Sequence, residues 1–226
     1  MTPVSTYRQP ADLPAQLPIF PLRGAILLPR ASMPLNVFEP RYLSMVDHVM
    51  SGSRVLGVVQ PNAASGQNES PQGKDVPLHA VGCVGRVTSY QELEDGRYTI
   101  GLTGIARFEI ITEITSDEPF RLVAVAYDKF TGDFDDGLGE QQVDREHLLR
   151  VLRSYLEANK MQADWSAIER ASSEVLINAL SVMSPYGPEE KQALLEAKGL
   201  RERADVLIAL AEMDLASGGE SGGTIQ

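Results

Sequence analysis

The stretch VGCVGRVTSYQELEDGRYTIGLTGIARFEI, residues 81–110, gives the strongest indication of the fold because it predicts a long β-hairpin. Two runs rich in Val, Ile, Thr, Tyr and Phe, residue types that favour strands, lie on either side of Glu94-Asp95-Gly96. An Asp-Gly pair readily supplies the positive φ that a tight reversal needs. We therefore expect two long antiparallel strands joined at this turn.

Shorter β-like runs surround the hairpin and extend the predicted sheet. They are LPIFPL, MPLNVF, VLGVVQ and FRLVAVAYDKF, at residues 17–22, 33–38, 55–60 and 120–130. Glycines at positions 82, 85, 101 and 104 lie inside the hairpin strands, where they weaken a strand unless it must bend or bulge. We expect a strongly curled sheet or a small barrel.

Three prolines limit where these segments can lie. Pro18, Pro21 and Pro34 have no amide proton to donate to a neighbouring strand, so we expect their segments at sheet edges or at bulges. On this ground the predicted barrel is incomplete. Residues 61–78, rich in Pro, Gly, Asn, Ser and Gln, predict a long mobile loop between two strands.

The composition changes at TGDFDDGLGE, residues 131–140, where acidic and turn-forming residues replace the β-like pattern. Charge runs between domains are usually solvated. We therefore expect residues 132–140, which include Asp133, Asp135 and Asp136, to form an acidic linker.

Beyond the linker, apolar residues recur with the period of amphipathic helices. The stripes comprise Leu148, Leu152 and Tyr155, then Ile168, Ala171, Val175, Leu176, Ala179, Leu180 and Met183, then Leu200, Ala204, Leu207, Ile208, Ala211 and Leu215. The predicted domains are a flexible N-terminus (1–15), a β domain (16–131), the linker (132–140), a helical subdomain (141–216) and a disordered tail (217–226).

The formal net charge of −11 disfavours a nucleic-acid partner, because affinity for phosphates comes largely from Lys and Arg. The acidity lies in the second half of the chain. Residues 1–131 hold 11 Lys and Arg against 13 Asp and Glu, whereas residues 132–226 hold 9 against 18. There is no apolar run of about 18 residues and no secretory leader, so we expect a cytoplasmic protein with no membrane partner.

No motif indicates nucleotide, metal or nucleophilic chemistry. G-x-x-x-x-G-K-[ST], G-x-G-x-x-G, H-E-x-x-H and C-x-x-C are absent, and the acidic run lacks the later glutamate of a calcium loop. Cys83 lies in a β run, where a buried apolar role is expected, and His48 and His147 are expected at the surface. We therefore expect no catalytic residue, no metal and no cofactor.

Three blocks of the chain carry a family resemblance: LPIFPLRGAILLPRASMPLNVFEPRYLSMV at residues 17–46, the hairpin at 81–110, and the helical stretch at 173–213. Their order resembles the Lon protease N-terminal substrate-binding domain. The resemblance covers about residues 16–215 and implies an α+β fold, a PUA-like β pseudo-barrel followed by a small C-terminal helical bundle. The ATPase and peptidase domains of full-length Lon have no counterpart here, which implies a stand-alone recognition module of bacterial type.

The resemblance, with strand edges that offer unpaired backbone groups, implies a non-catalytic polypeptide-binding module. Its expected partners are unfolded or apolar polypeptide segments, or a partner protein. The candidate polypeptide-binding residues are Leu22, Arg23, Phe38, Arg41 and Tyr42. PUA domains bind RNA, so an RNA-binding PUA-like protein is the alternative. A third reading, an uncharacterised hydrolase, would place Glu39 or Glu109 in a concave pocket.

A strand-to-helix corner is predicted where the MPLNVF run meets the next apolar segment. Pro40 suits the first helical position because its φ is fixed and its missing amide proton would have been unpaired there. Glu39 then occupies the N-cap, and Phe38 and Leu43 have the spacing of a hydrophobic staple. Positions two apart do not face each other on a helix, so Glu39 and Arg41 need not be partners and each is free to pair elsewhere.

Overall fold

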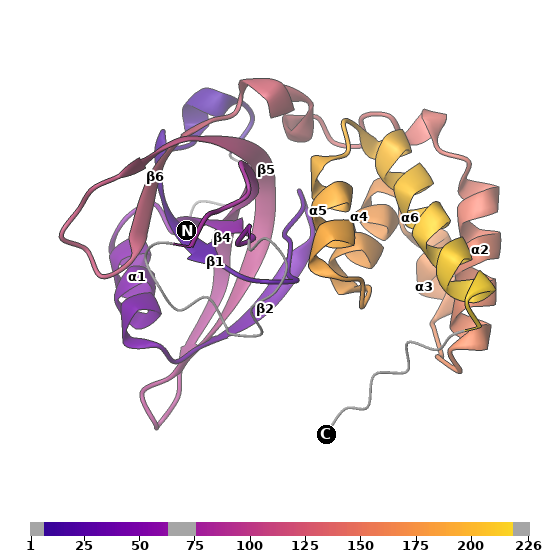
Figure 1. Ribbon diagram of the computed structural model, residues 1–226, viewed down its shortest axis with the longest axis horizontal. Coiled ribbons are helices and arrows are strands. Elements are labelled where there is room, and N and C mark those ends of the chain that lie inside the picture. The colour runs from indigo at the N-terminus through magenta and orange to yellow at the C-terminus, as the bar shows by residue number, and fades with distance from the viewer. Residues whose placement is uncertain (1–6, 63–75, 219–226) are drawn as a thin grey trace.

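The computed structural model describes residues 7–62 and 76–218. A β barrel formed by the first half of the chain lies beside a bundle of helices formed by the second half (Figure 1). The α+β fold class is therefore confirmed. Most of the predicted mobile loop and of the disordered tail, and residues 1–6 of the predicted flexible start, lie outside the described residues, so these stay predictions. The described part of the start contains the 3₁₀-helix Pro10–Asp12, and Leu13 is buried in the core.

Strand pairing closes the sheet on itself. The described strands are β1 (Gln16–Pro21), β2 (Ser32–Val37), β3 (Val55–Val59), β4 (Val81–Glu92), β5 (Tyr98–Ile114) and β6 (Arg121–Ala126). They pair in the order β2-β5-β4-β3-β1-β6, and β5 pairs with β6 as well. The ring β5-β4-β3-β1-β6 is thus a closed barrel, and β2 is an added edge strand on β5.

The hairpin predicted at residues 81–110 is present as β4 and β5. Gly96 has a φ of +79°, as the Asp-Gly reversal requires. The pairing register of β4 and β5 is shifted between Val84 and Gly85, so the hairpin has a β-bulge next to one of the glycines that lie inside its strands. A Cβ on Gly104 would lie 2.0 Å from the carbonyl oxygen of Leu28, so only glycine allows this close approach of two backbones.

The prediction that the barrel is incomplete is wrong. β1 carries Pro18 and Pro21 yet pairs with β6 on one side and with β3 on the other. The two pairings are staggered: β6 pairs as far as Ile19, and β3 pairs only from Ile19 onward. Each proline is therefore paired with a neighbouring strand on one side only, so its missing amide proton does not prevent β1 from lying between two strands. Pro34 does lie on an edge strand, β2, as predicted.

Helices cover the barrel on two sides. α1 (Pro40–Ser51) lies on the side opposite the C-terminal bundle (Figure 1). The bundle consists of α2 (Arg145–Ala158), α3 (Trp165–Arg170), α4 (Ser173–Met183), α5 (Pro188–Glu196) and α6 (Leu200–Ala216). The side chains of Asp144, Asp164 and Ser172 accept backbone hydrogen bonds at the starts of α2, α3 and α4, which fixes where those helices begin.

The core has two parts. One hydrophobic cluster, with Leu17, Phe108 and Val123, fills the barrel. The other joins the barrel to α1 and to the bundle, and it includes most of the predicted helical stripes. Val175 and Met183 are exceptions, because they are 49% and 79% exposed. Helices and barrel therefore share one apolar interface.

The predicted acidic linker is only partly solvated. Asp135 and Asp136 are exposed, but Asp133, at the end of the 3₁₀-helix Asp128–Phe134, is buried. Its carboxylate accepts hydrogen bonds from Nε and Nη2 of Arg107 at 2.9 and 2.8 Å. The expectation of a solvated residue is thus wrong for Asp133, because an arginine on the buried face of β5 requires a counter-charge.

Candidate polypeptide-binding surface

The strand-to-helix corner has the predicted backbone. Glu39 is the N-cap of α1 in an extended conformation, makes no side-chain cap hydrogen bond, and precedes Pro40 at the first helical position. α1 then buries Tyr42, Met45, Val46 and Val49 against the barrel. The corner is therefore anchored by the apolar face of the helix rather than by a capping side chain.

Glu39 and Arg41 form an ion pair, although their spacing in the sequence does not require one. Nε and Nη2 of Arg41 lie 3.0 and 2.8 Å from Oε2 of Glu39. The helical spacing rule fails here because Glu39 precedes the helix in extended backbone and its side chain can turn back over the first turn. Arg41 also lies over the ring of Tyr42, 4.5 Å from its centroid. The guanidinium is thus held in one place.

Tyr42 supports the corner from inside. It is 7% exposed, and its ring packs against that of Phe20 at a centroid distance of 4.2 Å. Burial raises the pKa of the Tyr42 hydroxyl, and the charge of Arg41 opposes that shift. By contrast Phe38 is 63% exposed. Phe38 is the apolar group that this corner presents to solvent.

Leu22 and Arg23 follow β1 and lie toward the bundle. The amide of Leu22 donates to the carbonyl of Val59 at 2.9 Å, and its side chain packs partly into the core. The next glycine, Gly24, donates its amide to Gln60, whose side chain in turn reaches α5. Arg23 is exposed. The five sequence candidates therefore form two groups, one at α1 and one near α5.

A groove that the sequence did not indicate lies beside β5 and β6. Its volume is about 500 Å³. Its lining residues are Val76, Pro77, Leu78, His79, Ala80, Ile110, Glu113, Arg121 and Val123. Ile111, next in the chain, is 61% exposed. None of the five sequence candidates lines this groove, because it forms only when residues 76–80 fold over the two strands.

Arg121 organises the groove. Its Nε and Nη2 lie 2.7 and 2.6 Å from the carboxylate oxygens of Glu113, and its Nη1 donates to the carbonyl of Val76 at 2.8 Å. Arg121 therefore connects β6 to Glu113 on β5 and to Val76 on the far side of the groove.

Two strand edges are open in the part of the chain that the structure describes. β2 pairs only with β5, but Pro34 interrupts its donors. β4 pairs with β3 only as far as Arg86, so from Thr88 to Glu92 it pairs with β5 alone. Unpaired backbone groups of this kind can accept an added strand.

Among the described residues, none of the carboxylate or thiol candidates from the sequence lines the groove. Glu39 pairs with Arg41, and Glu109 with Lys129 at 2.5 Å, and neither carboxylate lines the groove. Cys83 is fully buried, and burial raises the pKa of its thiol, which keeps it protonated. Within residues 7–62 and 76–218, no group of three His, Cys, Asp or Glu could hold a metal ion.

The helices of the described residues are all too short or too polar to cross a membrane. The fold and the surface define an α+β domain in which a small closed barrel, with open strand edges on β2 and at the end of β4, is packed against helices. The family model described as the ATP-dependent protease La (LON) substrate-binding domain matches residues 16–212. The chain belongs to this Lon substrate-binding domain family, as the resemblance implied.

Curated relatives agree with this assignment. The chain is 28% identical over 196 residues to a Lon protease of Flavobacterium johnsoniae, covering 85% of this chain and 23% of the relative. It is 30% identical over 227 residues to a Lon protease of Cytophaga hutchinsonii, covering 95% of this chain and 27% of the relative. The chain thus spans about a quarter of the length of these proteins.

Two solved structures share the fold. The Lon N-terminal domain protein from Xanthomonas campestris matches with a TM-score of 0.57 and 23% identity, over 86% of this chain and 97% of that one. The N-terminal domain of Mycobacterium avium complex Lon protease matches with a TM-score of 0.58 and 17% identity, over 87% and 98%. At these identities the likeness concerns the fold.

Proposed function

We propose that this protein is a non-catalytic, cytoplasmic polypeptide-binding module that recognises unfolded or apolar segments for protein quality control. The observation that carries the proposal is the match of residues 16–212 to a substrate-binding domain. The curated relatives are named proteases, but the matched part is about a quarter of their length. Recognition rather than peptide hydrolysis is therefore the function assigned to this part.

The surface supports a polypeptide ligand. An extended segment could add to the open edge of β4 through backbone hydrogen bonds, which suit any sequence. Phe38, 63% exposed, follows Val37, which like Glu92 pairs with Tyr98, so it lies at the same end of the sheet as this edge. Ile111, 61% exposed, lies at the other end of β5 and would contact a segment bound in the groove. Backbone pairing with few specific side-chain contacts gives the broad selectivity that unfolded substrates require.

The five sequence candidates have different proposed roles. Phe38 and Arg23 are exposed and would contact the ligand directly. Arg41, Tyr42 and Leu22 are half-buried or buried, so they would act by holding those two residues in place.

A binding titration tests the proposal. A fluorescently labelled, chemically unfolded model protein should bind the chain saturably, as measured by anisotropy. Replacing Phe38 by Ser should weaken binding about fivefold or more, the effect of losing an apolar anchor worth ~1 kcal/mol. Met183→Ser is the matched control, because Met183 is 79% exposed but lies on α4.

Two results would count against the proposal. Absence of saturable binding to unfolded polypeptides removes it. Binding of bulk RNA at low salt without polypeptide binding would replace it with the RNA-binding alternative.

Ion pairing of basic side chains favours a polypeptide ligand over RNA, because cations that are already paired with carboxylates neutralise few phosphates. The paired residues are Arg30, Arg41, Arg97, Arg107, Arg121 and Lys129.

A further inference from the structure

The open edge of β4 carries backbone groups that can pair with one more strand. Every residue from Thr88 to Glu92 is exposed, and the hairpin that contains them extends beyond the barrel, away from the helical bundle (Figure 1). The amide of Leu93 donates to the carbonyl of Arg97 at 2.8 Å, so these two residues form a hydrogen-bonded pair. Because such pairs alternate with non-hydrogen-bonded ones in an antiparallel ladder, the backbone groups of Tyr90 and Glu92 point away from β5, toward the open edge.

Tyr90 and Glu92 also share one face of the sheet, the face that α1 contacts. The ring centroid of Tyr90, a residue 39% exposed, lies 5.1 Å from that of Tyr98, and Tyr98 is paired with Glu92. The hydroxyl of Tyr98 donates to Asp47 of α1 at 3.1 Å. Since side chains alternate between the faces of a strand, an added strand would place every second side chain beside this ring and this carboxylate.

The hairpin end of this edge carries negative charge that no cation balances. Asp47, Glu92 and Glu94 are exposed, and no ion pair joins any of them to another described residue. The cation of the hairpin turn, Arg97, is already paired with Asp95 at 2.6 Å. A ligand that brings a cation to this end would therefore supply a missing counter-charge.

Arg54 lies at the opposite end of the open edge, where its carbonyl accepts the amide of Val87 at 2.8 Å. At about 3.4 Å per residue, this point is roughly 17 Å along β4 from Glu92. That separation exceeds the Debye length of about 8 Å at physiological ionic strength, so solvent screens Arg54 from the carboxylates. The edge is thus aromatic and negative at its hairpin end alone.

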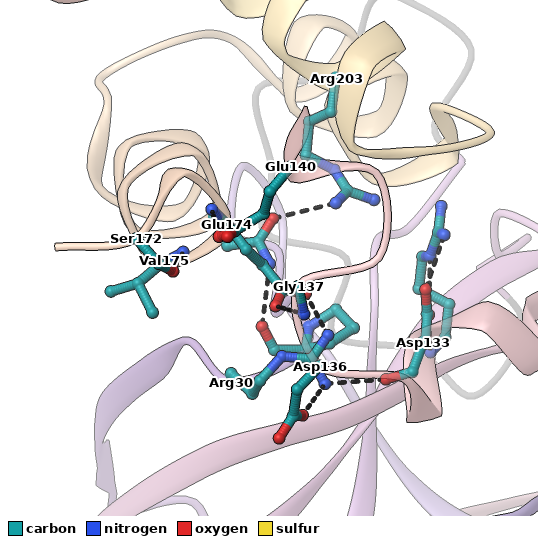
Figure 2. A network of polar contacts seen from close by, with 12 residues as sticks. Arg30, Asp133, Asp136, Gly137, Glu140, Ser172, Glu174, Val175 and Arg203 are labelled. Atoms are coloured by element: carbon teal, nitrogen blue, oxygen red, sulfur yellow. Dashed lines mark hydrogen bonds and ion pairs between the residues drawn. The ribbon is translucent and has the colours of Figure 1, made fainter. Parts of the chain in front are cut away.

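The acidic linker and the start of α4 offer a cation less. Asp136 lies 3.2 Å from Nη1 of Arg30, and Nη2 of Arg30 pairs with Glu174 (Figure 2). Glu140 accepts the backbone amide of Glu174 at 2.8 Å. Because these carboxylates serve contacts within the molecule, the hairpin edge is the better place for a basic ligand.

We propose that the β4 edge selects extended polypeptide segments in which a lysine or arginine stands two positions from an apolar residue. This inference rests on the proposed polypeptide-binding function and adds a preference to it. The apolar side chain would lie opposite Tyr90 and the cation opposite Glu92, because directly opposed side chains in a sheet have Cβ atoms about 5 Å apart. An acidic segment would bring like charges together, which opposes strand pairing.

Fluorescence anisotropy with three labelled peptides of one length tests this preference. Each peptide alternates Thr with Val, except that one Val is replaced by Lys, Gln or Glu. The full chain should bind the Lys peptide roughly three- to tenfold more tightly than the Glu peptide at low salt, with the Gln peptide between them. The difference should shrink as added salt screens the charges.

Charge reversal at exposed positions locates the preference. In Glu92→Lys, the Glu peptide should bind at least as tightly as the Lys peptide, because the group opposite the variable side chain has become a cation. Tyr90→Ser should weaken binding of all three peptides alike, by a few-fold. Glu157→Lys, the same charge change at an exposed position of α2, is the control and should keep the wild-type order.

Equal binding of the Lys and Glu peptides, with saturable binding of the unfolded model protein, would overturn the preference but not the proposed function. Loss of the preference in Glu157→Lys would also overturn it, since the cause would then be the net charge of −11 rather than this edge. A dimer that Glu92→Lys dissociates in sedimentation would overturn it as well, because a second copy of the chain would occupy the edge. If neither the peptides nor the unfolded protein bind, the proposed function fails and this inference with it.

Discussion

Arg107 and Asp133 form a strongly enclosed ion pair, with side chains 4% and 9% exposed. Replacing Asp133 by Asn should leave the guanidinium buried without its counter-charge and lower the free energy of unfolding by about 3–5 kcal/mol. Urea denaturation measures this loss. Asp136→Asn is the control, because Asp136 is 89% exposed and its pair with Arg30 contributes about 1 kcal/mol or less. If both variants lost the same free energy of unfolding, the buried Arg107–Asp133 pair would not be the more important of the two for stability.

At Gly104 the backbone of β5 passes against the segment before β2. Gly104→Ala should lower the free energy of unfolding by about 1–3 kcal/mol or more, since the new Cβ meets a carbonyl that can move only with its backbone. Chemical denaturation followed by circular dichroism checks the change. In Gly199→Ala, where nothing lies within 4 Å of the new Cβ, the loss should stay below about 1 kcal/mol.

The place of an individual residue could be predicted from the sequence where neighbouring residues and backbone preference determine it. Pro40 at the start of α1 and Gly96 in the hairpin follow from backbone preference, and Cys83 is buried as its β run indicated. Asp133 was not predictable, because its partner Arg107 lies 26 positions earlier in the chain.

Among the elements, the long hairpin and the helical stripes could be predicted because each carries a repeating local pattern. The closure of the barrel could not, since it depends on β6 pairing with both β1 and β5. The groove beside β5 and β6 was missed because residues 76–80 carry no periodic signal and are placed by contacts with distant parts of the chain, among them Gln60, Ile110 and Arg121. The division into domains at residues 131 and 140 stays a prediction.

Packing of α5 against α4 buries a titratable amine. Nζ of Lys191 donates to the carbonyls of Ser181 and Val182 at the end of α4, and burial lowers the pKa of Lys191 from 10.5 to about 8. Between pH 8 and 10.5 the unfolded chain keeps a proton that the folded chain has released. Stability contributed by this lysine should therefore rise with pH through that window and be lost as pH falls through 8.

The comparison of wild type with Lys191→Met isolates this dependence. Relative to the variant, the free energy of unfolding of the wild type should rise by about 1–2 kcal/mol between roughly pH 7.5 and 9.5. Lys160→Met, at an exposed position, should follow the wild type at every pH. A constant difference between the wild type and Lys191→Met would show that the buried amine keeps its proton.

At the scale of the whole molecule, the shared apolar cluster predicts that the barrel and the bundle unfold together. Trp165, the one tryptophan of the sequence, lies in α3 with Arg153 over its ring at 4.5 Å, so its fluorescence reports on the bundle. In urea, its transition should coincide with that of far-UV circular dichroism, which reports on the whole chain. An earlier tryptophan transition would show that the bundle opens independently.

The pairing of β1 with β6 also determines when the barrel can close during folding. Gln16 lies opposite Ala124, so the ring closes only when segments more than a hundred positions apart meet. Contacts of such long sequence separation carry a large loop-closure cost and make folding slow, on the order of milliseconds to seconds. During synthesis the barrel therefore stays open until β6 has left the ribosome, and the first strands spend that interval exposed to chaperones.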